Sequence, residues 1–305
     1  MDKDRPMVSV CMITYNHEEY ISRAIDGVLA QQTDFSIELV IGEDCSTDKT
    51  ASIISGYVER YPALINTVFR KVNMGALPNF LDTLKLCTGR YIAVCEGDDY
   101  WIDSLKLQKQ VDFLEQNPDY SLCFHNFFYL ADGSLKLASL FHGDAISFDD
   151  YAGAQEGIQT LTVLFRNIVK PVVGKKILSK IRGSKFLFLQ LAELGKMKYL
   201  PEPMAVYRIH AGGIWSGANI MNKAKMALEN IEAMALYYRA NPKTRNLIRT
   251  AYTRTSFNFI NSCFRQNEFS HAFRVFILSL SHGAAVFDFG FIFYYVYRIS
   301  IKRKF

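Results

Sequence analysis

The feature that most constrains the fold is a short apolar run that ends abruptly on acidic residues. The run spans residues 92–95, and Glu96, Asp98 and Asp99 follow it directly. An uninterrupted apolar run of this length predicts a fully buried strand. Carboxylates at its end would lie at the carboxyl edge of a sheet, where open α/β folds bind ligands.

These three carboxylates repel one another unless a cation lies among them. A divalent ion suits a site made of oxygen ligands, and the phosphate oxygens of a bound ligand would complete its coordination. The alternative is an acidic surface turn that binds nothing. The close spacing of Glu96, Asp98 and Asp99 favours the metal site.

Strand and helix patterns alternate through the first 125 residues. This alternation predicts an α/β fold with a mainly parallel sheet and flanking helices. The second strand also ends in a turn-rich acidic stretch, which contains Asp44. The strands are expected at residues 8–13, 37–41, 66–70 and 92–95.

The order of these motifs resembles the family 2 glycosyltransferases of GT-A fold. The motifs are TYN after the first strand, EDCSTDKT after the second, then NMG and GRYIAVCEGDDYW. In that family the first acidic loop binds the base and ribose of a sugar nucleotide. The resemblance therefore implies a GT-A, Rossmann-like domain with Asp44 at the base-binding position and Thr14 and Asn16 lining the nucleotide pocket. Ordinary turn and loop roles are the alternatives for each of these residues.

The second acidic loop matches the Asp-X-Asp motif of the family, which holds a divalent metal against the diphosphate. Glu96, Asp98 and Asp99 cover this motif, with Glu96 where the family usually has Asp. The implied cofactor is Mn²⁺ or Mg²⁺, which stabilises the negative charge that forms on a departing diphosphate. Asp98 is therefore expected to contact both metal and nucleotide.

A second cluster lies at residues 207–216, which resemble the YRIHxGGxWS segment of one branch of the same family. We expect a loop here, from which His210 reaches the metal or diphosphate and Arg208 neutralises phosphate. Trp215, together with Trp101 after the acidic turn, is expected to contact the acceptor sugar. A structural histidine and tryptophans packed in the core are the alternatives.

The general base is not identified by the sequence. The same branch usually carries Gly-Asp-Trp ahead of this segment, and its Asp is the expected base, whereas this chain has serine at the matching position, Ser184. Serine at its normal pKa is a poor base. Glu193, Glu202 and His210 are the remaining candidates, and their spacing selects none of them.

The domain organisation follows from the same patterns. Residues 1–216 are expected to form the GT-A domain, with a nucleotide-binding half to about residue 125 and an acceptor half at 126–216 that includes a loop at 131–157. Residues 217–305 are expected to form a C-terminal helical region.

The C-terminal tail is aromatic and ends in basic residues. Asp288 and Gly290 interrupt its apolar stretch, so a helix lying on a cytoplasmic membrane surface fits residues 284–305 better than a membrane span. The alternative is a terminal helix packed on the core or on a partner.

Composition limits the kinds of ligand and the cellular compartment to be expected. The net charge of +5 suits anionic ligands or a membrane surface, and no nucleic-acid-binding motif is evident. The six cysteines never form CxxC, which favours reduced thiols in a cytoplasmic protein. The charged first seven residues show no signal peptide.

We therefore expect a metal-dependent glycosyltransferase that moves a sugar from a nucleotide-diphospho-sugar, by resemblance a UDP-sugar. Its acceptor would be a saccharide or lipid-linked glycan in cell-surface polysaccharide biosynthesis, and the reaction would be inverting. One alternative is a catalytically impaired homologue that binds sugar nucleotides or glycans, because serine replaces the expected base. A nucleotidyltransferase is disfavoured, since the first loop is not a Gly-rich basic loop.

Overall fold

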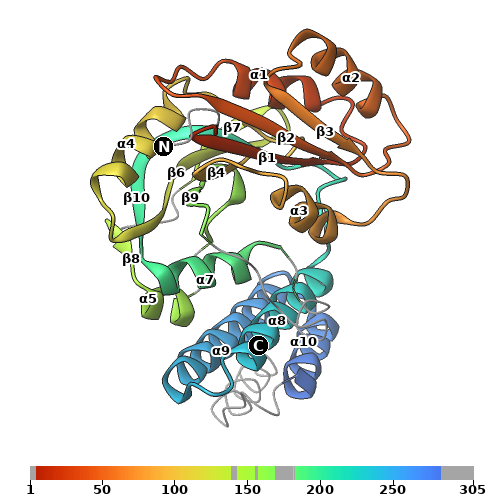
Figure 1. Cartoon of the computed structure of the whole chain (residues 1–305). Helices are drawn as coiled ribbons and strands as arrows, with labels where there is room; N and C mark the ends of the chain where they lie inside the picture. The colour runs from red at the N-terminus through yellow and green to blue at the C-terminus, as the bar shows by residue number, and fades with distance from the viewer. Residues whose placement is uncertain (1–4, 139–142, 155–156, 169–180, 182, 283–305) are drawn as a thin grey trace. The chain divides into compact units, whose positions relative to one another are not determined.

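A computed structural model of the chain describes residues 5–138, 143–154, 157–168, 181 and 183–282 (Figure 1). These residues fall into two compact units, which are described separately. The first unit contains the sheet and extends to Gly213. Of the described residues, the second contains 149–154, 181, 183–186 and 214–282.

The first unit is built on a mixed sheet. Its strands are β1 (Val8–Thr14), β2 (Ile37–Glu43), β3 (Ile65–Phe69), β4 (Tyr91–Val94), β5 (Tyr100–Trp101), β6 (Tyr120–Ala131), β7 (Ser134–Leu137), β8 (Ala145–Ile146), β9 (Leu164–Arg166) and β10 (Lys196–Arg208). The order is β3-β2-β1-β4-β9-β6-β10-β5, with β7 paired to β6 and β8 to β10. The first four strands in this order run parallel, so the carboxyl ends of β1, β2 and β4 meet at one edge.

Helices flank this sheet, as the sequence predicted. They are α1 (Ile21–Leu29), α2 (Thr50–Arg60), α3 (Ala76–Leu84), α4 (Lys106–Gln116) and α7 (Lys185–Leu194), the last shared between the two units. Alternate residues of β1, Val8, Val10 and Met12, are fully buried in a core that also takes side chains from α1, α2 and α4. The prediction of a mostly parallel α/β domain is confirmed.

Gly42 lets α3 approach the end of β2. The side chain of Asn79 donates a hydrogen bond to the Gly42 carbonyl (2.8 Å), and a Cβ at position 42 would lie 2.1 Å from Thr83 Oγ1. Any larger residue would push α3 away. This contact holds the turn that precedes α3 close to the acidic loop after β2.

The second unit is helical. It contains α8 (Ile220–Tyr237), α9 (Pro242–Arg265), α10 (Phe269–His282) and most of α5 (Phe148–Ala154). Asn219 and Asn241 cap α8 and α9 through side-chain bonds to backbone amides. The predicted C-terminal helices are therefore present. No helix in the described part of the chain is long and apolar enough to cross a bilayer. The prediction for the tail at 284–305 lies outside the described residues.

Two expectations about the acceptor half are corrected. Residues 131–157 are not one loop, because they contain β7, β8 and α5. Asp132 and Gly133, with φ of 48° and 76°, form the tight turn between β6 and β7.

The late segment also differs from the expected loop. Arg208 belongs to β10, which pairs with β6 and continues through register shifts around Pro203. Prolines fit a strand where its ladder is interrupted. His210 therefore lies directly beyond a strand, which fixes its direction more firmly than a loop would.

Candidate functional site

The loops after β1 and β2 are joined by hydrogen bonds. The backbone N–H of Asn16 donates to Ser46 Oγ (2.9 Å), and the backbone N–H of Thr47 donates to Asn16 Oδ1 (2.8 Å). Asn16 and Cys45 both adopt left-handed backbone conformations, with φ of 54° and 63°. Non-glycine residues in this region are strained and cluster at functional loops.

Asp44 and Thr14 lie where the sequence predicted, at the ends of neighbouring strands. The Asp44 backbone N–H donates to the Thr14 carbonyl (3.0 Å). Its buried carboxylate accepts backbone N–H bonds from Met74 (2.8 Å) and Gly75 (2.9 Å) and so fixes the turn before α3. Each carboxylate oxygen keeps a further acceptor position. The nucleotide roles of Asp44, Thr14 and Asn16 stay predictions.

Gly97 brings the acidic loop against β1. Its backbone N–H donates to the Ile13 carbonyl (2.9 Å), and a Cβ there would lie 2.6 Å from Thr14 Oγ1. Only glycine permits this approach. The ends of β1 and β4, and with them Thr14 and Asp98, are therefore held together.

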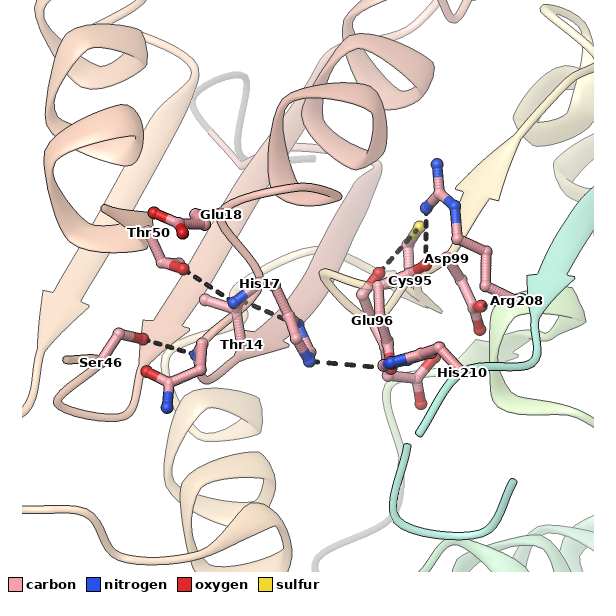
Figure 2. A network of polar contacts seen from close by, with 12 residues as sticks. Thr14, His17, Glu18, Ser46, Thr50, Cys95, Glu96, Asp99, Arg208 and His210 are labelled. Atoms are coloured by element: carbon pink, nitrogen blue, oxygen red, sulfur yellow. Dashed lines mark hydrogen bonds and ion pairs between the residues drawn. The ribbon is translucent and has the colours of Figure 1, made fainter. Parts of the chain in front are cut away.

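Asp98 faces two imidazoles. Its Oδ2 lies 3.1 Å from His210 Nε2 and 3.7 Å from His17 Nε2. Figure 2 shows His17 coming from the loop after β1 and His210 from beyond β10, and the centroids of the two rings lie 6.2 Å apart. Tyr20 completes the group, with its ring centroid 4.9 Å from that of His210. Asp98 and His210 are thus brought together, as predicted.

Sequence reasoning missed His17 and Tyr20 as members of this group. Thr14 Oγ1 lies 3.1 Å from His17 Nδ1, so the hydroxyl orients the ring whose other nitrogen faces Asp98. The signal was the position of His17 immediately after the TYN motif. Spacing alone did not show that this loop meets a segment nearly 200 residues later in the chain.

Arg208 binds the acidic loop itself. Its backbone N–H donates to Asp99 Oδ1 (2.8 Å), and its Nη1 donates to the Asp98 carbonyl (2.6 Å). The guanidinium lies over the rings of Tyr100 (4.4 Å) and Tyr20 (5.1 Å). This residue therefore positions the loop, and its predicted contact with phosphate remains a prediction that would use its other donors.

The three carboxylates differ in charge state. Burial raises the pKa of Glu96 to about 7, and burial beside Asp98 and Glu96 raises the pKa of Asp99 well above its usual range. Burial also opposes ionisation of Asp98, but the bonds and charges of His210 and His17 outweigh it and lower the Asp98 pKa. Asp98 is thus the carboxylate of the three that is held ionised.

The donor set fits a divalent cation whose shell is partly supplied by a ligand. Glu96 Oε2 is buried and has no hydrogen-bond partner among the described residues. In the same part of the chain, no three His, Cys, Asp or Glu side chains form a complete metal site. Asp98 and His210 offer one oxygen and one nitrogen, and Mg²⁺ sites commonly combine one or two protein ligands with phosphate oxygens and water.

The prediction that Trp101 contacts the acceptor is corrected. The side chain is 4% exposed and belongs to the core. Its indole N–H donates to the Leu161 carbonyl (3.0 Å), and Lys106 Nζ lies 4.0 Å from the ring centroid. Its pairing within β5 turns the ring inward, so no face is left for a sugar.

Two of the remaining candidates are exposed carboxylates of the first unit. Glu202 is exposed on β10, six residues before Arg208, which corresponds to about 20 Å of extended strand. Glu193 is exposed near the end of α7. Ser184 and the 45%-exposed Trp215 belong to the second unit. Their predicted roles stay predictions.

Comparison with known proteins places this geometry in a family. The model of the family described as "Glycosyl transferase family 2" matches residues 9–171. An uncharacterized protein of Mycobacterium tuberculosis is 40% identical over 214 residues, which cover 69% of this chain and 61% of the relative. The putative teichuronic acid biosynthesis glycosyltransferase TuaG of Bacillus subtilis is 31% identical over 209 residues, covering 67% and 80%. The chain thus spans about three fifths of the length of its mycobacterial relative.

Solved structures share the fold at low identity. Residues 1–349 of the S. aureus protein TarS, in complex with UDP-GlcNAc, align with a TM-score of 0.53 at 17% identity, covering 88% of this chain and 90% of that TarS chain. A mannosyltransferase of Pyrobaculum calidifontis, in complex with GDP-Man and Mn²⁺, aligns with a TM-score of 0.57 at 16% identity, covering 97% and 80%. Both confirm the GT-A architecture.

Proposed function

The chain belongs to glycosyltransferase family 2, and we propose that it transfers a sugar from a nucleotide-diphospho-sugar to a saccharide or lipid-linked glycan. The observation that carries the proposal is the position of Asp98. Its ionised carboxylate lies at the carboxyl edge of the sheet, between two imidazoles and near the strand end that bears Asp44. The UDP-sugar complex of TarS supports UDP as the donor nucleotide.

The residues divide the work of binding the donor. Asp44, Thr14 and Asn16 would contact the nucleoside, since they belong to the mutually bonded loops after β1 and β2, in which Thr14 and Asp44 are buried and Asn16 is exposed. Asp98 and His210 would hold Mn²⁺ or Mg²⁺, a role that the Mn²⁺ complex of the mannosyltransferase supports. When bound, the cation supplies charge stabilisation to the departing diphosphate.

The other acidic-loop residues keep this arrangement in place. Asp99 accepts the backbone N–H of Arg208 and so fixes the position of β10 beside the loop. His17, oriented by Thr14, approaches Asp98 from the loop after β1. Glu96, with its free buried oxygen, would contact the cation directly or through water.

The finer features of the reaction are proposals that rest on the family resemblance. These are inversion at the anomeric carbon and a role in cell-surface polysaccharide synthesis on the cytoplasmic side, with the tail at 284–305 touching the membrane. The acceptor hydroxyl must lose a proton as it attacks, and that step needs a base near the anomeric carbon. Among the candidate bases, His210 is the one that lies at the carboxylate cluster.

Calorimetric titration tests the donor site. UDP is titrated into the full chain with Mn²⁺ and with EDTA, and uridine is titrated in parallel. We expect UDP binding at least tenfold tighter with Mn²⁺, and uridine binding that does not depend on the metal. Equal UDP affinities in Mn²⁺ and EDTA would reject the metal site, and no UDP binding in either would reject the donor.

A second candidate function follows from Ser184, which stands where the resembling branch has its base. In this case the chain binds the donor but does not transfer sugar. The test is to measure sugar release and transfer for the natural chain and for Ser184→Asp across several UDP-sugars. Donor binding without turnover, restored by Ser184→Asp, would favour the impaired homologue. Turnover by the natural chain would exclude it.

A further inference from the structure

Lys106 is a buried cation that the donor site does not explain. Its side chain is fully buried at the start of α4, and its Nζ donates to Gln110 Oε1 (2.7 Å). The ammonium lies 4.0 Å from the centroid of the Trp101 indole. None of the ion pairs found between described residues involves Lys106, so an aromatic ring and an amide oxygen take the place of a carboxylate.

Such a group is costly to keep. Burial lowers the pKa of Lys106 to about 7, so its charged and neutral forms interconvert near neutral pH. A methionine would fill a similar volume without desolvating a charge. The ammonium therefore has to contribute something that an apolar side chain of this length would not.

Its contact with Trp101 provides that contribution. Trp101 pairs with Ala205 and Tyr100 with Val206, which joins β5 to the last part of β10. Arg208 and His210 follow directly along this strand. Trp101 thus anchors the junction through which the late segment reaches the acidic loop.

Gln110 extends the same connection through the core. Its side-chain N–H groups donate to the carbonyls of Cys123 (3.3 Å) and Thr162 (3.0 Å), while its oxygen accepts from Lys106. The side-chain contacts from Trp101 to Lys106 and from Lys106 to Gln110 therefore connect β5 through α4 to β6 and to the turn before β9.

We infer that Lys106 is a positioning residue for the donor site, whose ammonium holds Trp101 and thereby the β5–β10 pair that presents Arg208 and His210 to the acidic loop. The inference rests on the proposed function only where its ligand is UDP with Mn²⁺. Because the contact with the ring depends on charge, loss of the proton from Nζ weakens it. Donor affinity then falls as the pH rises through neutrality.

The neighbouring titratable groups do not produce this effect themselves. The surrounding elements contribute Asp103, Cys95 after β4, and Cys123 and His125 on β6. Burial raises the pKa of Cys95 well above its usual value and that of Cys123 to about 12, and it lowers the pKa of His125 well below its usual value. Hydrogen bonds from the Lys109 side chain and the Leu105 backbone N–H keep the pKa of the partly exposed Asp103 below its usual value. Lys106 is the member of this described cluster whose charge changes near pH 7.

Fluorescence tests the contact without any ligand. The chain has two tryptophans, so Trp215→Phe leaves Trp101 as the single indole emitter. We expect Trp101 emission to titrate with a midpoint near pH 7, and the titration to vanish when Lys106→Met is added. A titration that persists with Lys106→Met, or that is missing with Lys106 present, overturns the inference.

Donor binding tests the positioning role in the full chain with Trp215 intact. Lys106→Met should weaken UDP binding in Mn²⁺ about tenfold at pH 6, as expected for loss of one buried cation–π contact. Lys106→Arg keeps the charge at all pH values, so at pH 6 it should bind within about threefold of the natural chain and lose the fall in affinity as the pH rises through 7. If Lys106→Met does not fold, the pH dependence of Lys106→Arg decides the question alone.

The outcomes separate the two proposals. If the natural chain binds no UDP, the proposed function fails while the fluorescence titration still reports on the Lys106–Trp101 contact. If it binds UDP and Lys106→Met binds equally well at pH 6, the positioning role is wrong and the proposed function stands. A fall in affinity with rising pH around 7 that Lys106→Arg retains also overturns the role, because it must then come from other groups. Ionisation of Glu96, whose pKa burial raises to about 7, would strengthen cation binding over this range and so has the opposite sign.

Discussion

The loops after β2 and β4 both place an aspartate at the same sheet edge, but the two carboxylates are used differently. Asp44 accepts two backbone amide bonds, from Met74 and Gly75. Asp98 instead turns one oxygen toward two imidazoles, His210 and His17. The Asp44 carboxylate satisfies backbone N–H groups of a neighbouring turn, whereas the Asp98 carboxylate faces imidazole side chains, which can themselves bind a cation. A shared acidic motif therefore does not imply a shared task.

Replacing Asp98 should have the largest effect of the changes that distinguish the two loops. Asp98→Asn removes the charge that the two imidazoles face and that a cation would need. We expect UDP affinity in Mn²⁺ to fall by about 100-fold or more, since loss of a direct ligand exceeds the 10–100-fold typical of its supporting residues. Affinity in EDTA should change little. Isothermal titration calorimetry under both conditions measures the difference.

The control for this variant is Asp112→Asn on the exposed side of α4, where the carboxylate accepts a hydrogen bond from the Gln108 side chain (2.9 Å). It removes the same charge from the same unit at a solvent-exposed position. Both variants should retain the thermal stability of the natural chain within a few degrees. An Asp98→Asn protein that keeps its Mn²⁺-dependent UDP affinity would show that the cation lies elsewhere.

Asp44→Ala should have the next largest effect, and on stability as well as on binding. It leaves the amides of Met74 and Gly75 without their acceptor and loosens the turn before α3. Loss of two charge-assisted bonds should cost about 3 kcal/mol in free energy of unfolding, measured by urea denaturation. Uridine and UDP affinities should fall by the same factor, with and without Mn²⁺.

The conservative change Asp44→Asn sharpens this result. It keeps one acceptor oxygen for the two amides, so it should recover part of the lost stability. A purely metal-dependent loss of UDP affinity in Asp44→Ala would mean that the loop after β2 serves the cation. The distinction between the two loops would then be wrong.

The sequence predicted the parts of the site that are local in the chain. Asp44 and Asp98 each follow a buried strand within a few residues, and parallel strands bring such ends to one edge. The α/β class followed from the same alternation. The family match and the fold confirm these expectations, while the roles of the individual residues remain to be tested.

The long-range parts could not be predicted, because they depend on pairings that no local pattern records. Trp101 points into the core since β5 pairs with β10, a strand that begins almost 100 residues later. The rings of His17 and His210, 6.2 Å apart between centroids, likewise come together through long-range strand pairing. The hairpin at Asp132–Gly133 is different, since an Asp-Gly pair is a local sequence signal for a tight turn between two strands.

Asn16 gives the smallest effect and tests whether the loop after β2 depends on its neighbour. Its Oδ1 accepts bonds from the backbone N–H and the hydroxyl of Thr47, and its backbone is left-handed. Asn16→Gly loses the bonds but adopts this conformation freely, so it should cost about 1 kcal/mol of stability. Asn16→Ala also loses the bonds and adds backbone strain, for a total of about 2 kcal/mol.

Urea denaturation of the two variants separates the bonds from the strain, and uridine titration shows what each does to the nucleoside pocket. Uridine affinity should fall a few-fold in both variants, and UDP affinity should keep its dependence on Mn²⁺, because Asp98 and His210 are untouched. Equal stabilities for the two variants would mean that the loop relaxes out of its left-handed conformation. If UDP affinity no longer depended on Mn²⁺, the loops after β2 and β4 would act as one unit. Loss of the Asn16–Thr47 bonds, which involve only the loop after β2, would then have abolished cation binding at the loop after β4.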